Sequence, residues 1–427
     1  MTKKSPMLRS DYVQSAAMQE ASHDALSIVN APVAAQTTNV PVLVLGEGIT
    51  PLGVVRAFAR QGIPVYGACG AHDLLRRSRF YRDLPGYEPA PRGLRAEPTA
   101  IAQAVERSGL PRVVLCACSD QFSAAVATLP NAAQTQYLRS MPSGETLRLL
   151  NDKGELALLL QQLKIDHPFT RLVGRAEDLD ELLQPHDEQL FLKPRDSQRF
   201  FDLYKRKAFR VASLADARSR LDDIQRHGLE MVLQAYVPGP ASNHYFVDGF
   251  RDRTGVVRVH FARRRLRIYP PDFGNSTAMV SVPETEMGGA IEALDKLLEA
   301  MEYRGIFSAE FKRDARDGRY RLLEVNTRPW WFIDFAVRSG ADVCSMMYHD
   351  AVGLPVASVS GYRIGARCVY PHYDGAAVAE LRRRGEPYGW LRWGAELVGA
   401  MQPVWVWDDP MPAIFEAASE LRQRARR

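Results

Sequence analysis

Two glutamates and one asparagine in the last third of the chain lie in a pattern that can bind a metal ion. Glu310 precedes the turn residues Asp317-Gly318, and Glu324 and Asn326 follow them. Alternating apolar residues on both sides of an Asp-Gly turn predict a β-hairpin. Side chains on a strand repeat every two residues, so Glu324 and Asn326 share a face that Glu310 can reach from the partner strand. Two carboxylates and a carboxamide oxygen suit Mg²⁺ that also holds nucleotide phosphates. The alternative is a hairpin whose polar face is simply solvated.

The same residues carry a family resemblance. Glu310, Glu324 and the Glu-Val-Asn-Thr-Arg run at 324–328 resemble the metal-binding core of the ATP-grasp superfamily, and the resemblance extends from about Leu150 to Leu354. It implies ATP and Mg²⁺ as cofactors, with Mn²⁺ as a substitute, and metal binding by the two glutamates and Asn326. It also implies an ATP-grasp fold, although a fold alone does not identify a substrate.

Composition is compatible with such an enzyme. The chain has 427 residues, 46% hydrophobic and 25% charged, which is ordinary for a soluble protein of two or three domains. A formal net charge of +5 without a long basic run argues against a nucleic-acid partner. The longest apolar stretches are too short for a membrane span, and no secretory signal follows the first lysines. Five cysteines without a zinc-like quartet fit a reducing cytoplasm, and Cys116 and Cys118 are expected in a buried strand.

The order of patterns predicts an α/β protein in several parts. Residues 1–38 lack clear strands and are expected to form a flexible extension. In residues 39–149, buried strands at 41–46, 63–68 and 113–116 alternate with helices, which predicts a parallel sheet covered on both sides. Residues 150–360 are expected to form the ATP-binding and catalytic region, of α+β type. Residues 361–427 are expected to form a small α/β appendage.

Helix caps and strands within these parts are also predicted. Thr50 and Pro51 are expected to begin a helix that reaches about Gln61, and Ser119 or Asp120 to cap a later one. The chain is expected to be helical from Pro329-Trp-Trp to about Gly353. Residues 404–407, Val-Trp-Val-Trp, are expected to form a strand whose tryptophans serve packing.

Glycines after the first strand invite a second interpretation. Gly46, Gly48 and Gly53 resemble a dinucleotide-binding turn, but four residues precede the last glycine and no carboxylate ends the second strand. ATP-grasp ligases usually carry an N-terminal α/β domain of this kind. We therefore expect residues 46–50 to face the substrate rather than a nicotinamide cofactor.

The resemblance also assigns the nucleotide site. Lys153 in the Asn-Asp-Lys segment and Lys193 at the end of an apolar strand resemble the family's phosphate-binding lysines. Residues 195–207 occupy the position of the phosphate-covering loop, but they contain no glycine. Closure is therefore expected to use Lys205, Arg206 or Lys207 against the triphosphate, and Lys207 is the one assigned to the cofactor. The backbone that reads adenine is expected at Gln234, Ala235, Tyr236 and Val237.

Arginines supply the predicted charge for the reacting groups. Strand alternation directs Arg263, Arg265 and Arg267 to one face and Arg264 to the other. Guanidinium groups bind carboxylates and phosphates in a bidentate manner, which favours Arg265 and Arg267 as catalytic residues. In the family an arginine after the metal asparagine commonly contacts the acyl substrate or its phosphate, which assigns Arg328. Asn243 and His244 stand where many relatives bind the ribose with a carboxylate.

Together these patterns and the resemblance predict an ATP-dependent carboxylate–amine ligase. The carboxylate of a small acid would attack the γ-phosphate, and an amine would displace phosphate from the acyl phosphate. Two alternatives stay open, an ATP-grasp small-molecule kinase and a non-catalytic ATP–Mg sensor. The acid, the amine and the oligomeric state are not determined, and a homodimer is left open.

Overall fold

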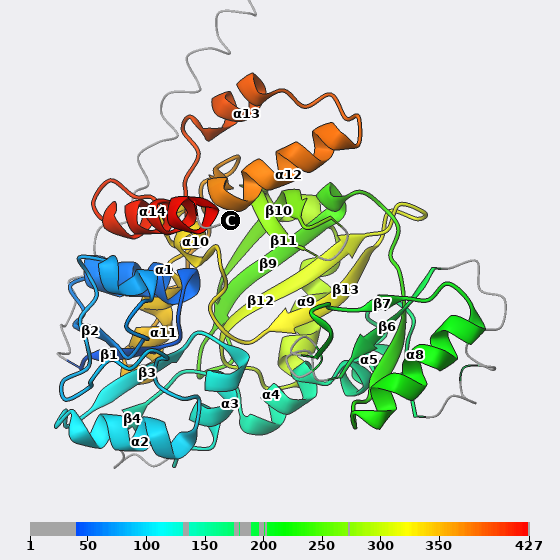
Figure 1. The fold of residues 1–427 in the computed structure, drawn as a ribbon. Helices are drawn as coiled ribbons and strands as arrows, with labels where there is room; N and C mark the ends of the chain where they lie inside the picture. The colour runs from blue at the N-terminus through cyan, green and yellow to red at the C-terminus, as the bar shows by residue number, and fades with distance from the viewer. Residues whose placement is uncertain are drawn as a thin grey trace, which may run out of the picture. The chain divides into compact units, whose positions relative to one another are not determined.

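The computed structural model describes residues 40–130, 136–174, 179, 189–195, 200, 203–271 and 274–425. The predicted extension at 1–38 lies outside these residues, as does much of the predicted phosphate-covering loop at 195–207. The described residues form one compact unit with three β-sheets (Figure 1).

The first sheet is parallel, as predicted, with strand order β2-β1-β3-β4. Its central strand β1 is Val42–Leu45, four apolar residues that are all buried because helices cover both faces of the sheet. Cys116 lies in β3 and Cys118 directly after it, and both are buried and free, as predicted. The other elements are β2 Val65–Gly67, β3 Val113–Ala117, β4 Tyr137–Leu138, α1 Ile49–Arg60, the 3-10 helix η1 Leu74–Arg77, α2 Pro98–Arg107 and α3 Asp120–Ala127.

One of the two helix caps predicted beside this sheet is wrong. Helix α1 begins at Ile49, so Thr50 lies inside it, and Gly48 occupies the N-cap position without a side-chain hydrogen bond. The Gly48 amide instead donates to Asp73 Oδ2 at 2.9 Å, a contact between distant residues that local sequence does not reveal. Ser119 caps α3 as expected, because its hydroxyl accepts from the Phe122 amide.

The second sheet is antiparallel, with order β5-β8-β6-β7. Asp152 caps α5, which begins at Lys153, by accepting from the amides of Gly154 and Glu155. The elements are α4 Gly144–Asn151, α5 Lys153–Gln162, β5 Thr170–Val173, β6 Leu190–Pro194, β7 Phe209–Arg210, α8 Leu214–Arg226 and β8 Met231–Ala235.

The third sheet has six antiparallel strands in the order β13-β12-β9-β10-β11-β14. Its strands are β9 His244–Arg251, β10 Val257–Tyr269, β11 Asn275–Ser281, β12 Gly305–Arg313, β13 Tyr320–Asn326 and β14 Arg367–Val369. Its helices are η2 Ala241–Asn243, η3 Glu284–Met287, α9 Ala290–Ala300, α10 Ile333–Arg338 and α11 Val343–Val352. The predicted hairpin is therefore β12 and β13, and the predicted helical stretch before Gly353 is present as α10 and α11.

Strand alternation separates a core face from a polar face on β12. Phe307, Ala309 and Phe311 join the hydrophobic core that includes Leu294 and Leu298 of α9. The intervening Ser308 and Glu310 face the other side of the sheet, where they line a cavity. The apolar side of the hairpin thus anchors the strand that presents the polar side.

The C-terminal residues do not form a separate sheet. Strand β14 pairs with β11, so residues of the predicted appendage extend the six-stranded sheet. The strand predicted at 404–407 is wrong, because that segment consists of bends and turns in which Val404 and Val406 are buried and Trp407 is 88% exposed. The remaining helices are α12 Pro371–Arg383, α13 Trp390–Leu397 and α14 Met411–Ala425.

Candidate active site

A cavity of about 410 Å³ is lined by strands of two sheets, β6 and β8 of the second and β9 to β13 of the third. Its size is within the range of small-molecule and cofactor sites. It brings together residues that lie up to 179 positions apart in the sequence, from Lys153 to Phe332. The predicted site residues that line it are Lys153, Lys193, Lys207, Gln234, Ala235, Tyr236, Val237, Arg265, Glu310, Glu324, Asn326 and Arg328.

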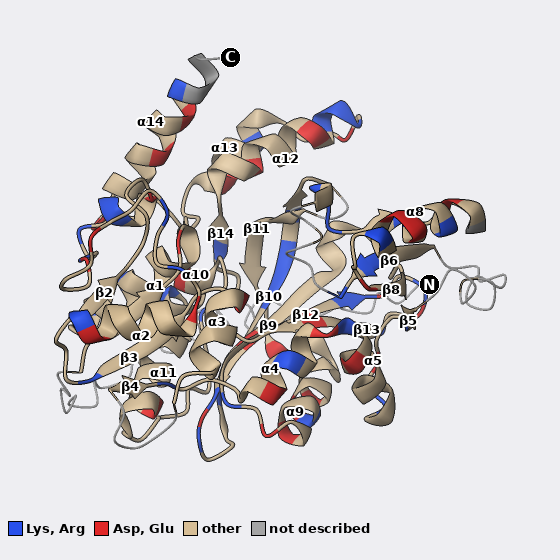
Figure 2. Cartoon of the chain, turned by 60° about the horizontal axis from the view of Figure 1, so that its bottom comes forward, with Lys and Arg blue, Asp and Glu red and all other residues tan. Residues whose placement is uncertain are grey.

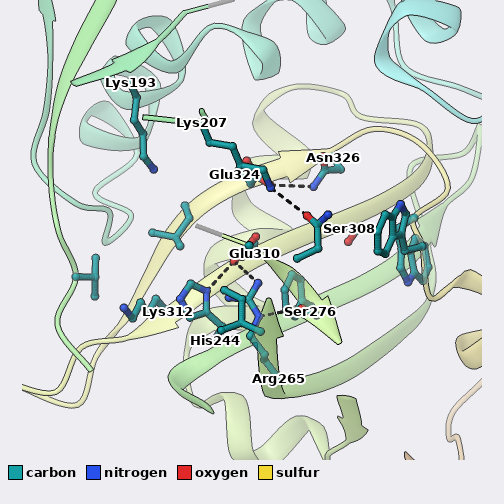
Figure 3. A pocket seen from close by; sticks show the side chains of 18 of the residues that line it. Lys193, Lys207, His244, Arg265, Ser276, Ser308, Glu310, Lys312, Glu324 and Asn326 are labelled. Carbon is teal, nitrogen blue, oxygen red and sulfur yellow. Dashed lines mark hydrogen bonds and ion pairs between the residues drawn. The ribbon is translucent and has the colours of Figure 1, made fainter. Parts of the chain in front are cut away.

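The hairpin register places the predicted metal ligands side by side. Glu310 is paired with Glu324, and Ser308 with Asn326. The Asn326 amide donates to Glu324 Oε1 at 3.3 Å, and Figure 3 shows both residues on the same side of the hairpin as Glu310. A register irregularity follows Glu310, so Leu323 is the extra residue on β13. This irregularity lets Leu322 and Val325 both reach the core while Glu324 stays on the cavity side.

Two neighbouring side chains orient Glu310. Arg265 Nη2 donates to Glu310 Oε1 at 3.1 Å, and His244 Nδ1 lies 2.7 Å from the same oxygen (Figure 3). Burial opposes ionisation of Glu310, but Arg265 and His244 outweigh it and hold the pKa of this carboxyl well below its usual range. Burial also lowers the pKa of His244 to about 4, although its bond to Glu310 opposes the shift. At neutral pH a neutral His244 therefore donates from Nδ1 to a carboxylate.

The donor set fits Mg²⁺ that is shared with nucleotide phosphates. Within the part of the chain that the structure describes, no group of three or more His, Cys, Asp or Glu side chains could hold a metal alone. Two carboxylates and a carboxamide supply a partial set of hard oxygen ligands, and Mg²⁺ in nucleotide sites completes its shell with phosphates and water. Like charges directly opposite on two strands are also unfavourable, so a cation beside Glu310 and Glu324 would stabilise the pair.

Lysines line the same cavity. The Lys193 side chain extends from β6 toward the hairpin carboxylates, and Lys207 Nζ donates to Asn275 Oδ1 at 3.0 Å (Figure 3). Burial lowers the pKa of Lys193 and the positive charge of Lys153 adds to the decrease, while Glu324 and Glu310 oppose it. Four lysines line this cavity, Lys153, Lys193, Lys207 and Lys312, and their positive charge suits a polyphosphate.

The end of β8 lines the cavity, as predicted, but two of its backbone amides are already hydrogen-bonded. The amides of Ala235 and Tyr236 already donate to the carbonyls of Phe169 and Gln189, at 2.9 and 2.7 Å. The Gln234 side chain donates to Thr170 at 3.0 Å and is buried. The amides of Ala235 and Tyr236 are therefore already paired within the protein. Adenine recognition by the backbone of residues 234–237 stays a prediction that would use other groups of this segment, such as the Val237 amide.

Basic residues lie along β10 (Figure 2), and the arginines at 263, 264 and 265 reach different surroundings. Arg263 pairs with the buried Asp248 and stacks on Phe246, with its guanidinium carbon 4.0 Å from the ring centre. Arg265 lines the cavity, and its Nε donates to Ser276 Oγ at 2.8 Å. Arg264 faces the other side of the sheet, near Glu286, as predicted.

Arg267 does not reach the cavity, which corrects its predicted catalytic role. Its guanidinium donates to Asp374 of α12 and to Glu396 of α13. The register between β10 and β11 is irregular on both sides of Arg267, so the simple alternation assumed for 263–267 does not hold there. The acidic partners come from residues more than a hundred positions away, which the local sequence does not show.

Arg328 lies in the cavity wall just after the β12–β13 hairpin and bonds to Asp120 of helix α3. Its Nε and Nη2 donate to the two oxygens of Asp120 at 2.7 and 3.0 Å. The Asp120 side chain is 50% exposed and that of Arg328 is 23% exposed, so a ligand can reach both. Sequence reasoning considered Asp120 only as a helix cap.

Unpaired polar atoms flank Arg328. Within the described residues, Thr327 Oγ1 and Trp330 Nε1 are buried and have no hydrogen-bond partner. Trp330 also lines the cavity, together with Trp331 and Phe332. Buried polar atoms are normally paired, so a ligand at this end of the cavity is expected to satisfy the indole N–H.

Several cavity residues were missed or only weakly indicated by the sequence. His244 was considered for a ribose contact, whereas the structure places it on Glu310. Lys312 is buried, with Nζ 4.1 Å from the Tyr236 ring centre. Its position two residues after Glu310 on the same strand is a signal that alternation offered. Residues 46–50, which were expected to face substrate, do not line this cavity.

Comparisons with known proteins agree with this architecture. No protein-family model matches the chain. The sequence is 23% identical over 331 residues to a D-aspartate ligase from Enterococcus faecium (strain Aus0004), which covers 73% of this chain and 76% of the relative.

Solved structures share the fold at low sequence identity. N5-carboxyaminoimidazole synthetase from Staphylococcus aureus complexed with ADP has a TM-score of 0.60 at 12% identity, covering 81% of this chain and 86% of that one. L-amino acid ligase from Bacillus licheniformis has a TM-score of 0.54 at 14% identity, covering 74% and 75%. The chain has the ATP-grasp fold, as the sequence predicted. The relatives named here, a D-aspartate ligase and an L-amino acid ligase, are ligases.

Proposed function

We propose that this protein is an ATP-dependent ligase that joins a small carboxylic acid to an amine through an acyl phosphate. The observation that carries the proposal is the polar face of the β12–β13 hairpin. There Glu310, Glu324 and Asn326 lie together in a cavity that also contains Lys193. The similarity to a D-aspartate ligase supports carbon–nitrogen bond formation as the outcome.

Each part of the cavity has a role in this proposal. Val237 and its neighbours at the end of β8 bind adenine, and Lys153, Lys193 and Lys207 bind the phosphates. Mg²⁺ held by Glu310, Glu324 and Asn326 would neutralise phosphate charge, and Mn²⁺ is an expected substitute. The acid attacks the γ-phosphate, which releases ADP, and the amine then displaces phosphate. Arg265 and Arg328 stabilise the charge on the transferring group.

We further propose that the activated acid is an amino acid. The relatives named above include a D-aspartate ligase and an L-amino acid ligase. Arg328 and Asp120 form an ion pair at the cavity wall, with both partners partly exposed. A zwitterion can insert between them, with its carboxylate on the guanidinium and its ammonium on the carboxylate.

The Asp120→Asn variant is expected to separate amino acids from other acids. Loss of the Asp120 charge should raise KM for an amino acid about tenfold or more, because a charge-assisted bond contributes about 1.5–3 kcal/mol. KM for the same acid without its amino group should change little. Steady-state ADP release with matched pairs of acids measures both values. An equal change for both acids would contradict an ammonium contact at Asp120.

Isotope transfer tests the proposed chemistry directly. Acid labelled with ¹⁸O in its carboxylate is expected to transfer one label to the released phosphate, because the acyl phosphate keeps a carboxylate oxygen until the amine displaces phosphate. Mass spectrometry of the phosphate measures this transfer. Amide formed with unlabelled phosphate, or release of AMP and pyrophosphate, would refute the mechanism. A stable phosphorylated product with no amine requirement would instead identify a kinase.

Location and assembly are part of the proposal. We propose a cytoplasmic protein, since its five cysteines are buried and free. No helix in the described ranges is long and apolar enough to cross a membrane. A homodimer also stays a proposal, and sedimentation analysis tests it.

A further inference from the structure

A buried polar cluster lies beside the candidate active site, where the C-terminal helices pack on the six-stranded sheet. Helix α12 contacts both β10 and β11, and α13 packs on α12 (Figure 1). At the centre of the cluster is Asp374 of α12, whose side chain is 0% exposed. No residue of the helices α12 and α13 lines the cavity, so the proposed reaction does not use this cluster directly.

Asp374 binds both neighbouring strands through its two oxygens. Oδ1 accepts from Arg267 Nε at 2.8 Å and from Thr277 Oγ1 at 2.6 Å. Oδ2 accepts from Arg267 Nη2 at 2.7 Å and from Trp393 Nε1 at 2.8 Å. Arg267 also donates to Glu396 at 2.6 Å. One buried carboxylate thus joins β10, β11 and α13.

The two strand residues that Asp374 holds belong to an irregular part of the β10–β11 ladder. Arg265 pairs with Met279 and Arg267 with Ala278, so the register passes over Leu266. Ile268 then pairs with Ser276, so the register passes over Thr277. Asp374 therefore bonds to one residue at each side of the irregularity, which is where the ladder itself constrains the strands least.

This irregular part of the ladder determines where Arg265 lies. Ser276 directly precedes Thr277, and its hydroxyl accepts from Arg265 Nε at 2.8 Å. Arg265 Nη2 in turn donates to Glu310 Oε1 at 3.1 Å. A continuous series of contacts therefore runs from Asp374 through the two strands to the carboxylate that we assign to the metal.

We propose that Asp374 is a positioning residue, which holds the β10–β11 irregularity so that Arg265 stays aligned with Glu310. This proposal depends on the proposed function in one respect: the cavity that contains Arg265 and Glu310 is taken as the catalytic site. The C-terminal helices then contribute to catalysis from outside the cavity.

The Asp374→Asn variant tests this role with little change in size. Asparagine replaces one oxygen with an NH₂ group, and in either amide orientation that group faces an N–H donor of Arg267. We expect kcat for ADP formation to fall about tenfold to a hundredfold, because small misplacements of catalytic groups have effects of this size. KM for ATP should stay within about threefold, since the adenine and phosphate contacts are separate. An unchanged kcat in folded Asp374→Asn protein would overturn the proposal.

Asp409→Asn is the matched control. Asp409 is also a buried carboxylate of the C-terminal segment, but it accepts from Arg56, Ser78 and the Arg79 amide of the N-terminal part. This variant should lower the thermal unfolding midpoint and leave kcat unchanged. If Asp409→Asn lowers kcat as much as Asp374→Asn, the effect is general destabilisation and the proposal fails.

A double-mutant cycle distinguishes positioning of Arg265 from a merely structural role. In an Arg265→Ala background, Asp374→Asn should have little further effect on kcat, because both changes remove the same contribution. Effects that multiply would refute action through Arg265. If Asp374→Asn does not fold, Thr277→Val removes one donor of the cluster instead. This variant should lower kcat less and should show the same coupling to Arg265→Ala. An unchanged kcat, or no coupling, would refute the proposal. ADP release is followed whatever the product, so a wild-type enzyme that forms no amide would reject ligation without affecting this test.

Discussion

The Glu324→Gln variant is expected to lose about a thousandfold in kcat for ADP formation while it keeps its fold. Glutamine preserves the size of the side chain but removes a charge opposite Glu310 in the hairpin. A bound metal contributes several kcal/mol of charge stabilisation to such reactions, and each 1.36 kcal/mol corresponds to about tenfold in rate. Glu324 lies at the cavity surface rather than in the core, so its replacement should not unfold the protein. Steady-state ADP release and circular dichroism measure the two quantities.

Metal affinity provides an independent measurement for Glu324. Mn²⁺ binding followed by electron paramagnetic resonance should weaken in Glu324→Gln whether or not the enzyme turns over. Asp317→Asn is the control, because Asp317 lies at the turn of the same hairpin and bonds to the Arg319 amide and Arg321. That variant should change stability but not metal affinity. Folded Glu324→Gln with normal Mn²⁺ affinity would remove Glu324 from the metal site.

The second large effect is expected from Lys193→Met, which should weaken ATP binding about tenfold to a hundredfold. Loss of a charge-assisted contact in a partly closed site corresponds to about 1.5–3 kcal/mol. Methionine keeps an unbranched apolar side chain of similar length and removes the ammonium group. Binding of the acid substrate should change much less, since Lys193 lies on the nucleotide side of the cavity in the proposed arrangement. Isothermal titration calorimetry with ATP and with the acid measures both affinities.

Lys164→Met is a control for the loss of one positive charge. Lys164 lines a second cavity, together with Asp166 and Arg319, and not the candidate active site. Its replacement should leave ATP affinity unchanged. Equal losses in both variants would indicate a general electrostatic effect, and an unchanged affinity in Lys193→Met would place Lys193 outside the nucleotide site.

Local patterns in the sequence predicted much of the candidate site. The Asp-Gly turn and flanking alternation located the β12–β13 hairpin, because a two-residue period determines which side chains share a face. The same rule separated Arg264 from Arg263 and Arg265. The position of Lys193 near the end of an apolar strand marked it as a candidate. These predictions hold because they depend only on residues that are neighbours in the chain.

Predictions failed where the answer depended on distant residues. Alternation placed Arg267 in the site, but a register irregularity and the partners Asp374 and Glu396 take it to the C-terminal helices. Thr50 was expected to cap α1, but the Gly48 amide is bonded to Asp73 instead. The apolar alternation at 404–407 resembles a strand, yet none of the described strands pairs with it, and Val404 and Val406 are buried in irregular backbone.

The sequence by itself determined the kinds of chemistry available to this protein: hard oxygen ligands, lysines at strand ends and arginines in a strand. Each of these follows from residue type and short-range spacing. Only the tertiary structure decided which of them meet, since a cavity wall is assembled from several strands with partners far apart in the chain. It joined Arg328 to Asp120 across 208 positions and His244 to Glu310 across 66. Such contacts depend on sheet order and register, which no single segment encodes.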